Sequence, residues 1–277
     1  MQDLNVSIVL YHTDKSILIK AIESVLKSNL VKHLFLIDNS RGDKLREIKS
    51  LSEKILYIHT RKNLGYGKAH NIALKKSLEN NIKYHLAMNP DIYFNEGVLE
   101  KLYRFMEENE EVGLVMPKVL YPNGKLQYLC KLLPTPFDLF SRRFLNWGVF
   151  KKIVEKRQNV YELRFTGYDK IIEAPFLSGC FMFLRVKILE KIGLFDERFF
   201  LYCDDLDLSR RIHSTSKTIL YPYCEIYHEW GRGSYKNFKL LIYHIVDAIR
   251  YFNKWGWFFD KERKETNKKI LKNNLFF

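Results

Sequence analysis

Short apolar runs alternate with helix-like stretches through the first ninety residues. Four runs, at 6–11, 34–37, 55–59 and 84–88, predict strands, and the first has the length and composition of a strand buried on both faces of a sheet. The stretches between them predict helices over 16–28, 43–52 and 68–78. This alternation predicts βαβ units, and therefore an α/β fold with a mostly parallel central sheet flanked by helices.

Polar clusters follow these strands directly. Right-handed crossovers place the C-terminal ends of parallel strands along one edge, where the ligands of open α/β sheets bind. The sequence therefore predicts a ligand site at that edge. The clusters are Tyr11-His12-Thr13, Asp38-Asn39-Ser40, the segment from Asn63 to Gly67, and Asn89-Pro90-Asp91.

After Asp91 the alternation weakens. The segment 137–160 is basic and aromatic without a clear period, and we interpret it as an irregular or helical insertion over the cleft. From residue 236 onward the chain is expected to be helical, aromatic and basic. The other expected elements are helices at 96–108, 187–192 and 206–213, a strand at 112–119, a turn at 122–124, an apolar segment at 176–184, and two short strands that end at His228.

Composition removes several classes of protein and leaves others open. The chain of 277 residues is 47% apolar, which excludes a disordered, collagen-like or low-complexity protein. Its 46 Lys and Arg against 32 Asp and Glu give a net charge of +14. Such a surface attracts polyanions: nucleic acid, an anionic membrane face, or a small molecule that carries a diphosphate.

Cysteine spacing and hydropathy predict a compartment. The four cysteines form no CxxC pair, the N-terminus does not read as a signal peptide, and no window of 18 residues is wholly apolar. We therefore expect a reduced, cytoplasmic chain without a membrane-spanning helix. The tail 236–277, with ten Lys and Arg against four Asp and Glu, suits either an anionic membrane interface or packing on the core.

The densest group of carboxylates is Asp204, Asp205 and Asp207. At the start of a helix all three favour its positive end, and crowded carboxylates raise one another's proton affinity, which suits a general base. The alternative is a helix cap with salt bridges to Arg210 and Arg211.

Other residues have a functional and a structural interpretation each. Asp38 could bind a base or ribose, or could form an Asx turn. Asp91 could hold a divalent cation together with a diphosphate, or could be a turn residue. His228 could complete a metal site and Arg232 could meet a phosphate, although a lone histidine is more often structural.

The segment Asn63-Leu64-Gly65-Tyr66-Gly67-Lys68-Ala69-His70-Asn71 lies between a predicted strand and a predicted helix. Its glycines permit close approach of the backbone to a phosphate at the helix N-terminus, although the segment could equally be an ordinary turn.

In this order, these segments resemble the family 2 glycosyltransferases, and most of all the rhamnosyltransferase-type members that build bacterial O-antigen and other surface polysaccharides. The resemblance covers about residues 5–235. It rests on Asp38-Asn39-Ser40 after the opening strands, on NLGYGKAHN, on MNPDIYF, on FLSGCFMFLR, and on GLFDERFFLYCDDLDLSRRI with His228 behind it.

The resemblance implies a GT-A-like single domain that inverts the anomeric carbon, with Mg²⁺ or Mn²⁺ as cofactor. The usual Glu-Asp pair reads Asp204-Asp205 here, so the resemblance allows either acid to be the catalytic base, and the alignment of the motif favours Asp205. Asp91 corresponds to the last acid of the metal-binding DxD motif, whose first acid is Asn89 here. His228 corresponds to the C-terminal metal ligand. The expected donor-nucleotide residues are Tyr11, Thr13, Asp38, Asn63, Gly65, Gly67, Asn71, Asn89 and Arg232.

We expect residues 1–120 to bind the nucleotide-sugar and 121–235 to bind the acceptor and carry the catalytic acids. The first choice of reaction is transfer of L-rhamnose from dTDP-rhamnose to a saccharide, lipid-linked at the inner face of the cell membrane, with a UDP-hexose donor next. Contact of 236–277 with that membrane would be peripheral. The rival classes are a basic nucleic-acid-binding protein, a nucleotidyltransferase, and a glycosyltransferase fold that only binds.

Overall fold

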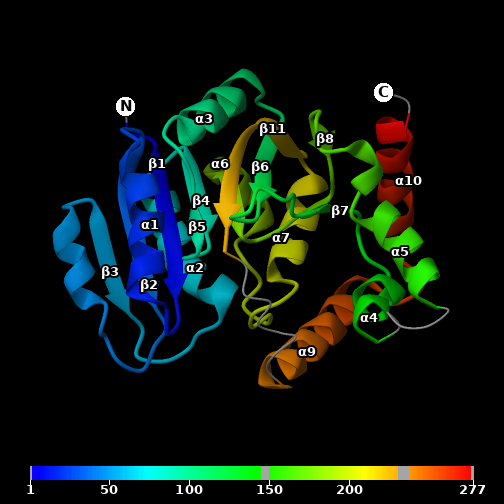
Figure 1. The fold of residues 1–277 in the computed structure, drawn as a ribbon, viewed down its shortest axis with the longest axis horizontal. Helices are drawn as coiled ribbons and strands as arrows, with labels where there is room; N and C mark the ends of the chain where they lie inside the picture. The colour runs from blue at the N-terminus through cyan, green and yellow to red at the C-terminus, as the bar shows by residue number, and fades with distance from the viewer. Residues whose placement is uncertain (1, 145–149, 230–237, 276–277) are drawn as a thin grey trace.

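The computed structural model describes residues 2–144, 150–229 and 238–275. Within these ranges nine strands form one sheet, whose path runs β3-β2-β1-β4-β10-β6-β11-β5 with β8 beside β11 (Figure 1). A separate pair joins β7 (Cys130–Lys131) to β9 (Phe176–Leu177). The strands of the large sheet are β1 (Leu4–Leu10), β2 (Val31–Asp38), β3 (Ile55–His59), β4 (Tyr84–Met88), β5 (Ile92–Tyr93), β6 (Val112–Leu120), β8 (Ile172–Glu173), β10 (Phe181–Arg185) and β11 (Lys217–His228).

The N-terminal half of the sheet is parallel, as predicted. Strands β3, β2, β1 and β4 run in one direction, and their register pairs Leu10 with Asp38 and Asp38 with His59. These strands therefore end at a common edge, where the polar clusters gather. Strand β10 is antiparallel to both β4 and β6 and joins the two halves into one domain.

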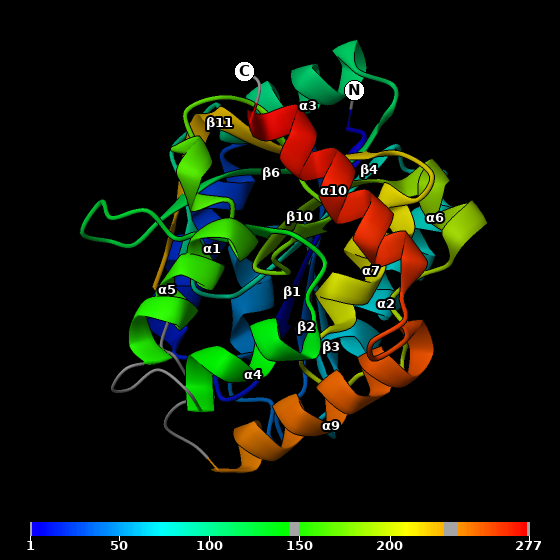
Figure 2. The same cartoon turned by 90° about the vertical axis from the view of Figure 1, so that its right-hand side faces the viewer.

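Helices cover both faces of the sheet. Figure 2 shows α1 on one side and α2, α6 and α7 on the other. Among the helices of the described residues, none combines the length and apolar character needed to cross a membrane. The α-helices are α1 (Lys15–Leu26), α2 (Tyr66–Glu79), α3 (Val98–Glu108), α4 (Pro136–Phe144), α5 (Phe150–Tyr161), α6 (Val186–Ile192), α7 (Asp204–His213), α9 (Phe238–Trp255) and α10 (Lys261–Leu275), and the 3₁₀ helices are η1 (Arg46–Leu51) and η2 (Arg164–Thr166).

Two predicted elements differ from the structure. The helix expected over 43–52 is only the 3₁₀ turn η1, because a single residue, Ile48, is buried there and no side chain caps its start. The two strands expected before His228 are one strand, β11, with a bulge. Its register against β6 jumps between Tyr221 and Glu225, where Pro222 lacks the N–H that a regular ladder needs.

The inner face of the C-terminal tail packs on the domain. Ala248, Tyr251 and Phe252 of α9 are buried, and the two terminal nitrogens of the Arg210 guanidinium, Nη1 and Nη2, donate to Asp260 at 2.8 Å each. Trp255 stacks on Arg210 with 4.0 Å between guanidinium carbon and ring centre. The prediction that the tail packs on the core is therefore confirmed for this face of α9, while the opposite face carries exposed apolar side chains.

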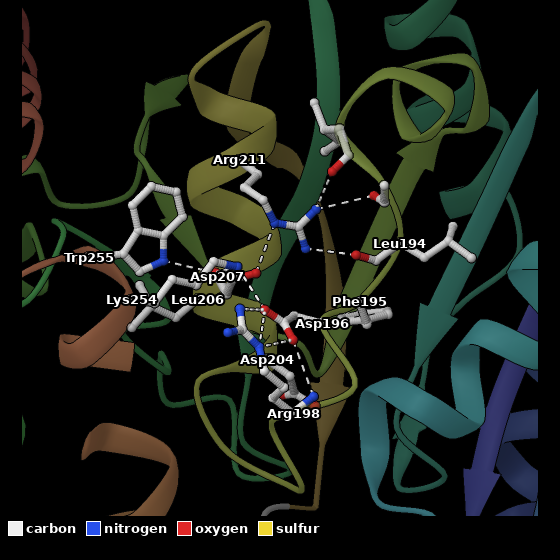
Figure 3. A network of polar contacts seen from close by, with 12 residues as sticks. Leu194, Phe195, Asp196, Arg198, Asp204, Leu206, Asp207, Arg211, Lys254 and Trp255 are labelled. Atoms are coloured by element: carbon white, nitrogen blue, oxygen red, sulfur yellow. Dashed lines mark hydrogen bonds and ion pairs between the residues drawn. The ribbon is translucent and has the colours of Figure 1, made fainter. Parts of the chain in front are cut away.

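A buried carboxylate fixes α9 against α7. The side chain of Asp207 accepts from Arg211 Nε at 2.8 Å and Trp255 Nε1 at 2.8 Å, and pairs with Lys254 Nζ at 2.6 Å (Figure 3). Lys254 also pairs with Asp196 at 2.9 Å. Asp207 is thus a structural residue. The expected salt bridge between this acidic group and Arg211 is present, whereas Arg210 pairs with Asp260 instead.

A chain of polar side chains crosses the core between β1, β4 and α2. Ser7 Oγ lies 2.7 Å from His70 Nδ1 and 2.8 Å from His85 Nε2, and His85 Nδ1 lies 2.7 Å from Ser77 Oγ. Burial lowers the pKa of His85 to about 3 and holds the pKa of His70 well below its usual value. Both imidazoles are therefore neutral in the folded protein.

We expect this neutrality to make the fold acid-sensitive below the ordinary histidine pKa of about 6.5. Because the unfolded chain takes up protons that folded His85 refuses, the unfolding free energy falls as pH drops. At pH 5 the loss from His85 alone is about 2 kcal/mol. Urea unfolding at pH 7 and pH 5 measures it. In the variant His85→Asn, the unfolding free energy should fall by about 2 kcal/mol less between pH 7 and pH 5 than in wild type. An equal fall in both proteins would contradict the prediction.

Candidate active site

A cavity of about 620 Å³ lies beside the start of α7. Its walls come from α4 and α5, from the segment between β6 and β7, and from the segment 201–206. The described parts of the insertion 137–160 thus form the helices α4 and α5, which line the cavity. Side chains that carry chemistry reach it from several elements: Tyr66, Asn89, Gln127, Lys131, Asp204, Asp205, His228 and His244.

The acidic pair opens α7 at the cavity. Asp204 is 2% exposed and accepts from the Gly67 N–H at 2.9 Å and from the Asp205 N–H at 3.0 Å. Asp205 is more exposed and accepts from the Gly179 N–H at 2.7 Å and the Leu206 N–H at 2.8 Å. Of the two carboxylates, Asp205 is therefore the one that a substrate hydroxyl can reach.

Burial raises the pKa of Asp204, and the charge of Asp205 raises it further. Burial also raises the pKa of Asp205, although the N–H groups of Gly179 and Leu206 oppose the rise. A carboxylate with a raised pKa accepts a proton more readily than an ordinary aspartate. The pair therefore has the proton affinity that a general base requires.

The glycine-rich segment packs against the chain that precedes the acids. A Cβ on Gly65, whose φ is +85°, would lie 2.1 Å from the Phe200 carbonyl oxygen, which accepts from the Tyr66 N–H at 2.8 Å. Asn71 is 2% exposed and exchanges hydrogen bonds with the Phe195 backbone at 2.9 and 3.0 Å. In this structure the glycine-rich segment thus fixes the position of the chain that leads into Asp204 and Asp205.

Asp91 and His228 face each other. His228 Nε2 lies 3.4 Å from Asp91 Oδ1, and both atoms are buried without a hydrogen-bond partner in the described part of the chain. Strand β5, which follows Asp91, pairs with the end of β11, so the sheet itself brings the two residues together. Two buried, unpartnered lone-pair atoms are an arrangement that a cation would satisfy.

Gln127 determines which nitrogen of His228 is free. Its amide nitrogen donates to the carbonyl oxygens of His228 at 2.9 Å and Leu120 at 3.4 Å, so its amide oxygen must be the atom 2.9 Å from His228 Nδ1. That oxygen can only accept, and Nδ1 therefore carries the proton. The lone pair of neutral His228 is then on Nε2, toward Asp91.

These residues fit a divalent cation that is shared with a ligand. A spacing of 3.4 Å suits two adjacent ligands of one ion. Within the described residues, no group of three or more His, Cys, Asp or Glu side chains is arranged to hold a metal ion. Asp91 and His228 would therefore supply two ligands, and diphosphate and water the others.

Of the remaining predicted residues that the structure describes, Asn89 alone lines this cavity. Asp38 is 1% exposed and accepts from the Tyr57 hydroxyl at 2.5 Å and the Ser40 N–H at 2.8 Å, which is the geometry of an Asx turn. The Tyr11 N–H donates to Thr13 at 3.2 Å, and Asn63 accepts from the Gly65 N–H at 2.9 Å. Arg232 lies outside the described residues.

Sequence reasoning missed three residues that support the site. Gln127 orients His228, the Tyr66 hydroxyl donates to the Gly179 carbonyl oxygen, and Asp247 contacts the segment before the acids. Only Asp247 left a signal in the sequence: it interrupts an apolar stretch of the tail.

The mixed α/β sheet flanked by helices matches the fold of GT-A-like glycosyltransferases. Two solved structures share the fold: S. aureus TarS (TM-score 0.59, 16% identity, 99% of this chain and 44% of that one) and GalNAc-T7 with UDP, GalNAc and Mn²⁺ (TM-score 0.62, 14% identity, 98% and 55%). The profile of glycosyl transferase family 2 matches residues 6–193. The chain belongs to that family.

One curated relative is the low-salt glycan biosynthesis hexosyltransferase Agl10 of Haloferax volcanii. It is 24% identical over 212 residues, which are 76% of this chain and 62% of the relative. The chain thus spans less than two thirds of the length of this relative, and less than half of TarS.

Proposed function

We propose that the protein transfers a sugar from a nucleoside-diphosphate donor to a hydroxyl of a saccharide, with inversion at the anomeric carbon. The observation that carries the proposal is that one cavity is lined by both the acidic pair and His228, whose imidazole faces Asp91. The fold and the family membership support the same reaction class.

In this reaction Asp205 takes the proton of the acceptor hydroxyl as that oxygen bonds to the anomeric carbon. The bond between the anomeric carbon and the diphosphate oxygen breaks on the opposite face, and nucleoside diphosphate leaves. The N–H groups of Gly179 and Leu206 hold the Asp205 carboxylate in place. Asp204, tied to the Gly67 N–H, supports the start of α7.

Asp91 and His228 would hold Mg²⁺ or Mn²⁺, which neutralises the departing diphosphate. GalNAc-T7, which shares the fold, was solved with Mn²⁺, and this supports a divalent ion in the present protein. Asp38, Tyr11, Thr13, Asn63, Gly65, Gly67, Asn71, Asn89 and Arg232 remain the proposed residues around the donor nucleotide, and 121–235 the acceptor-binding half.

For the donor we propose dTDP-rhamnose, with a UDP-hexose as the alternative that the hexosyltransferase relative favours. The acceptor would be a lipid-linked saccharide of a bacterial surface polysaccharide. Release of nucleoside diphosphate from a donor panel, with Mg²⁺, Mn²⁺ or chelator, tests this. Fastest release from a UDP-hexose would overturn rhamnose, and no release from any donor with saccharide acceptors would overturn the transfer.

The outer face of α9 supports contact with the cytoplasmic face of a membrane. Four exposed apolar residues recur at helical spacing along it, and two exposed phenylalanines follow in the turn before α10, all within the basic tail. A basic, amphipathic helix of this kind binds at the interface of an anionic bilayer. These residues are Phe238, Ile242, Val246, Ile249, Phe258 and Phe259.

We expect the protein to sediment with phosphatidylglycerol-containing vesicles and hardly with neutral ones. Replacing Ile242 and Ile249 together by Asp should weaken this partition by more than about tenfold, since each apolar side chain contributes about 1.5 kcal/mol or more when buried. Ile153→Asp, at a still more exposed apolar position on α5, is the control. Equal partition of both variants would contradict membrane contact through α9.

A further inference from the structure

One carboxylate of α9 holds the segment that leads into the acidic pair. Asp247 Oδ2 accepts from the backbone N–H groups of Phe200 at 3.0 Å, Leu201 at 3.0 Å and Tyr202 at 3.1 Å. Asp247 is fully buried, and its other oxygen accepts from Arg250 at 3.0 Å. Three successive N–H groups aimed at one point form a nest that binds an anion, which here is a side chain of the protein itself.

The segment 200–202 is also held by the glycine-rich segment at the start of α2. Its Phe200 carbonyl oxygen accepts from the Tyr66 N–H at 2.8 Å, so the chain is held between the glycine-rich segment and α9. Cys203, the next residue before the acids, has a left-handed backbone with φ of +62°. Such a conformation costs about 1–2 kcal/mol in a residue other than glycine and persists only where the surroundings enforce it.

The position of Asp247 is itself fixed. Seven residues further along α9, Lys254 pairs with Asp207, and Trp255 donates to the same carboxylate (Figure 3). Asp207 belongs to the helix that Asp204 and Asp205 open. Helix α9 therefore contacts α7 through Lys254 and Trp255, and contacts the segment before α7 through Asp247.

We propose that Asp247 is a positioning residue for sugar transfer: by binding the N–H groups of residues 200–202 it sets the entry of α7 and with it the position of the Asp205 carboxylate. The inference rests on the proposed function of Asp205. Loss of the contact would let the segment relax, and a displacement of about 1 Å in a reacting group is enough to cost about a hundredfold in rate.

Two variants test the inference. Asp247→Asn keeps the size of the side chain but removes the charge that attracts the three N–H groups, and Asp247→Leu removes every acceptor. We expect kcat to fall about tenfold or more in the first and further in the second, with the KM for donor within about threefold of wild type. Amide hydrogen exchange at residues 200–202 should become at least about tenfold faster.

Asp260→Asn is the matched control. Asp260 is also buried and bonded, but to Arg210 rather than to the segment before the acids. It should lower the melting temperature without lowering kcat or speeding exchange at 200–202. Equal kcat losses in Asp247→Asn and Asp260→Asn, or unchanged exchange in Asp247→Leu, would overturn the inference. If wild type transfers no sugar, the proposed function fails, and the exchange result still decides whether Asp247 holds this segment.

Discussion

Replacing Asp205 by Asn is expected to lower kcat for sugar transfer by about 10²–10⁴-fold, the usual contribution of a general base. The amide can still accept the Leu206 N–H, so the start of α7 should keep its shape. It cannot take a proton from the acceptor hydroxyl. Binding of nucleoside diphosphate, measured by calorimetry, should stay within about threefold of wild type, because the change removes a reacting group and no proposed donor contact.

Asp204→Asn is the matched control for this prediction. Asp204 has the same charge, is more deeply buried and is tied to the N–H of Gly67. We expect this variant to lose stability and to keep more activity than Asp205→Asn. If Asp204→Asn were the inactive variant and Asp205→Asn turned over normally, the base would be Asp204 and the assignment of the pair would be reversed.

The parallel half of the sheet could be predicted because its signals are local. Each strand is a short apolar run, and each polar cluster follows such a run directly, as Asp38 and Asn89 do. The acidic pair was found for the same reason, since three carboxylates lie within four residues. Chain order and right-handed crossovers then place the polar clusters that follow the parallel strands at one edge, without any knowledge of long-range contacts.

Support for the site came from distant parts of the chain and could not be predicted. Gln127 and His228 are 101 residues apart, and Asp247 lies 45 to 47 residues from the N–H groups that it accepts. A single glutamine carries no local pattern. An aspartate inside an apolar helical stretch does carry one, because a buried carboxylate must find donors, but the sequence does not say which donors those are.

The sequence leaves the tail open between membrane and core for a physical reason. Helix α9 is apolar on two sides: Tyr251 and Phe252 are fully buried, whereas Phe238 and Ile242 are exposed. Composition averages over both faces and cannot separate them. The structure shows that the inner face of α9 packs on the core, through contacts with Arg210 and Asp207. The vesicle experiment tests whether the outer face binds a membrane.

Replacing Asp91 by Ala is expected to weaken Mn²⁺ binding by more than about a hundredfold, and His228→Ala to do the same. Each change removes one of the two buried atoms that face each other at 3.4 Å. Because loss of a residue that only orients a ligand already costs about 10–100-fold in metal affinity, loss of a ligand should cost more. Mn²⁺ titration followed by electron paramagnetic resonance, with UDP or dTDP present, measures the affinity independently of turnover.

Gln127→Leu should give an intermediate loss of about 10–100-fold, because His228 would keep its place on β11 but lose the acceptor that keeps the proton on Nδ1. Gln158→Leu is the control, since Gln158 is a buried glutamine of the same cavity that bonds to the Asp138 carbonyl oxygen instead. Mn²⁺ affinity should be highest in wild type and Gln158→Leu, lower in Gln127→Leu and lowest in Asp91→Ala. Unchanged Mn²⁺ affinity in Asp91→Ala and His228→Ala would remove both residues from the metal site, and with them the reason for Gln127 to matter.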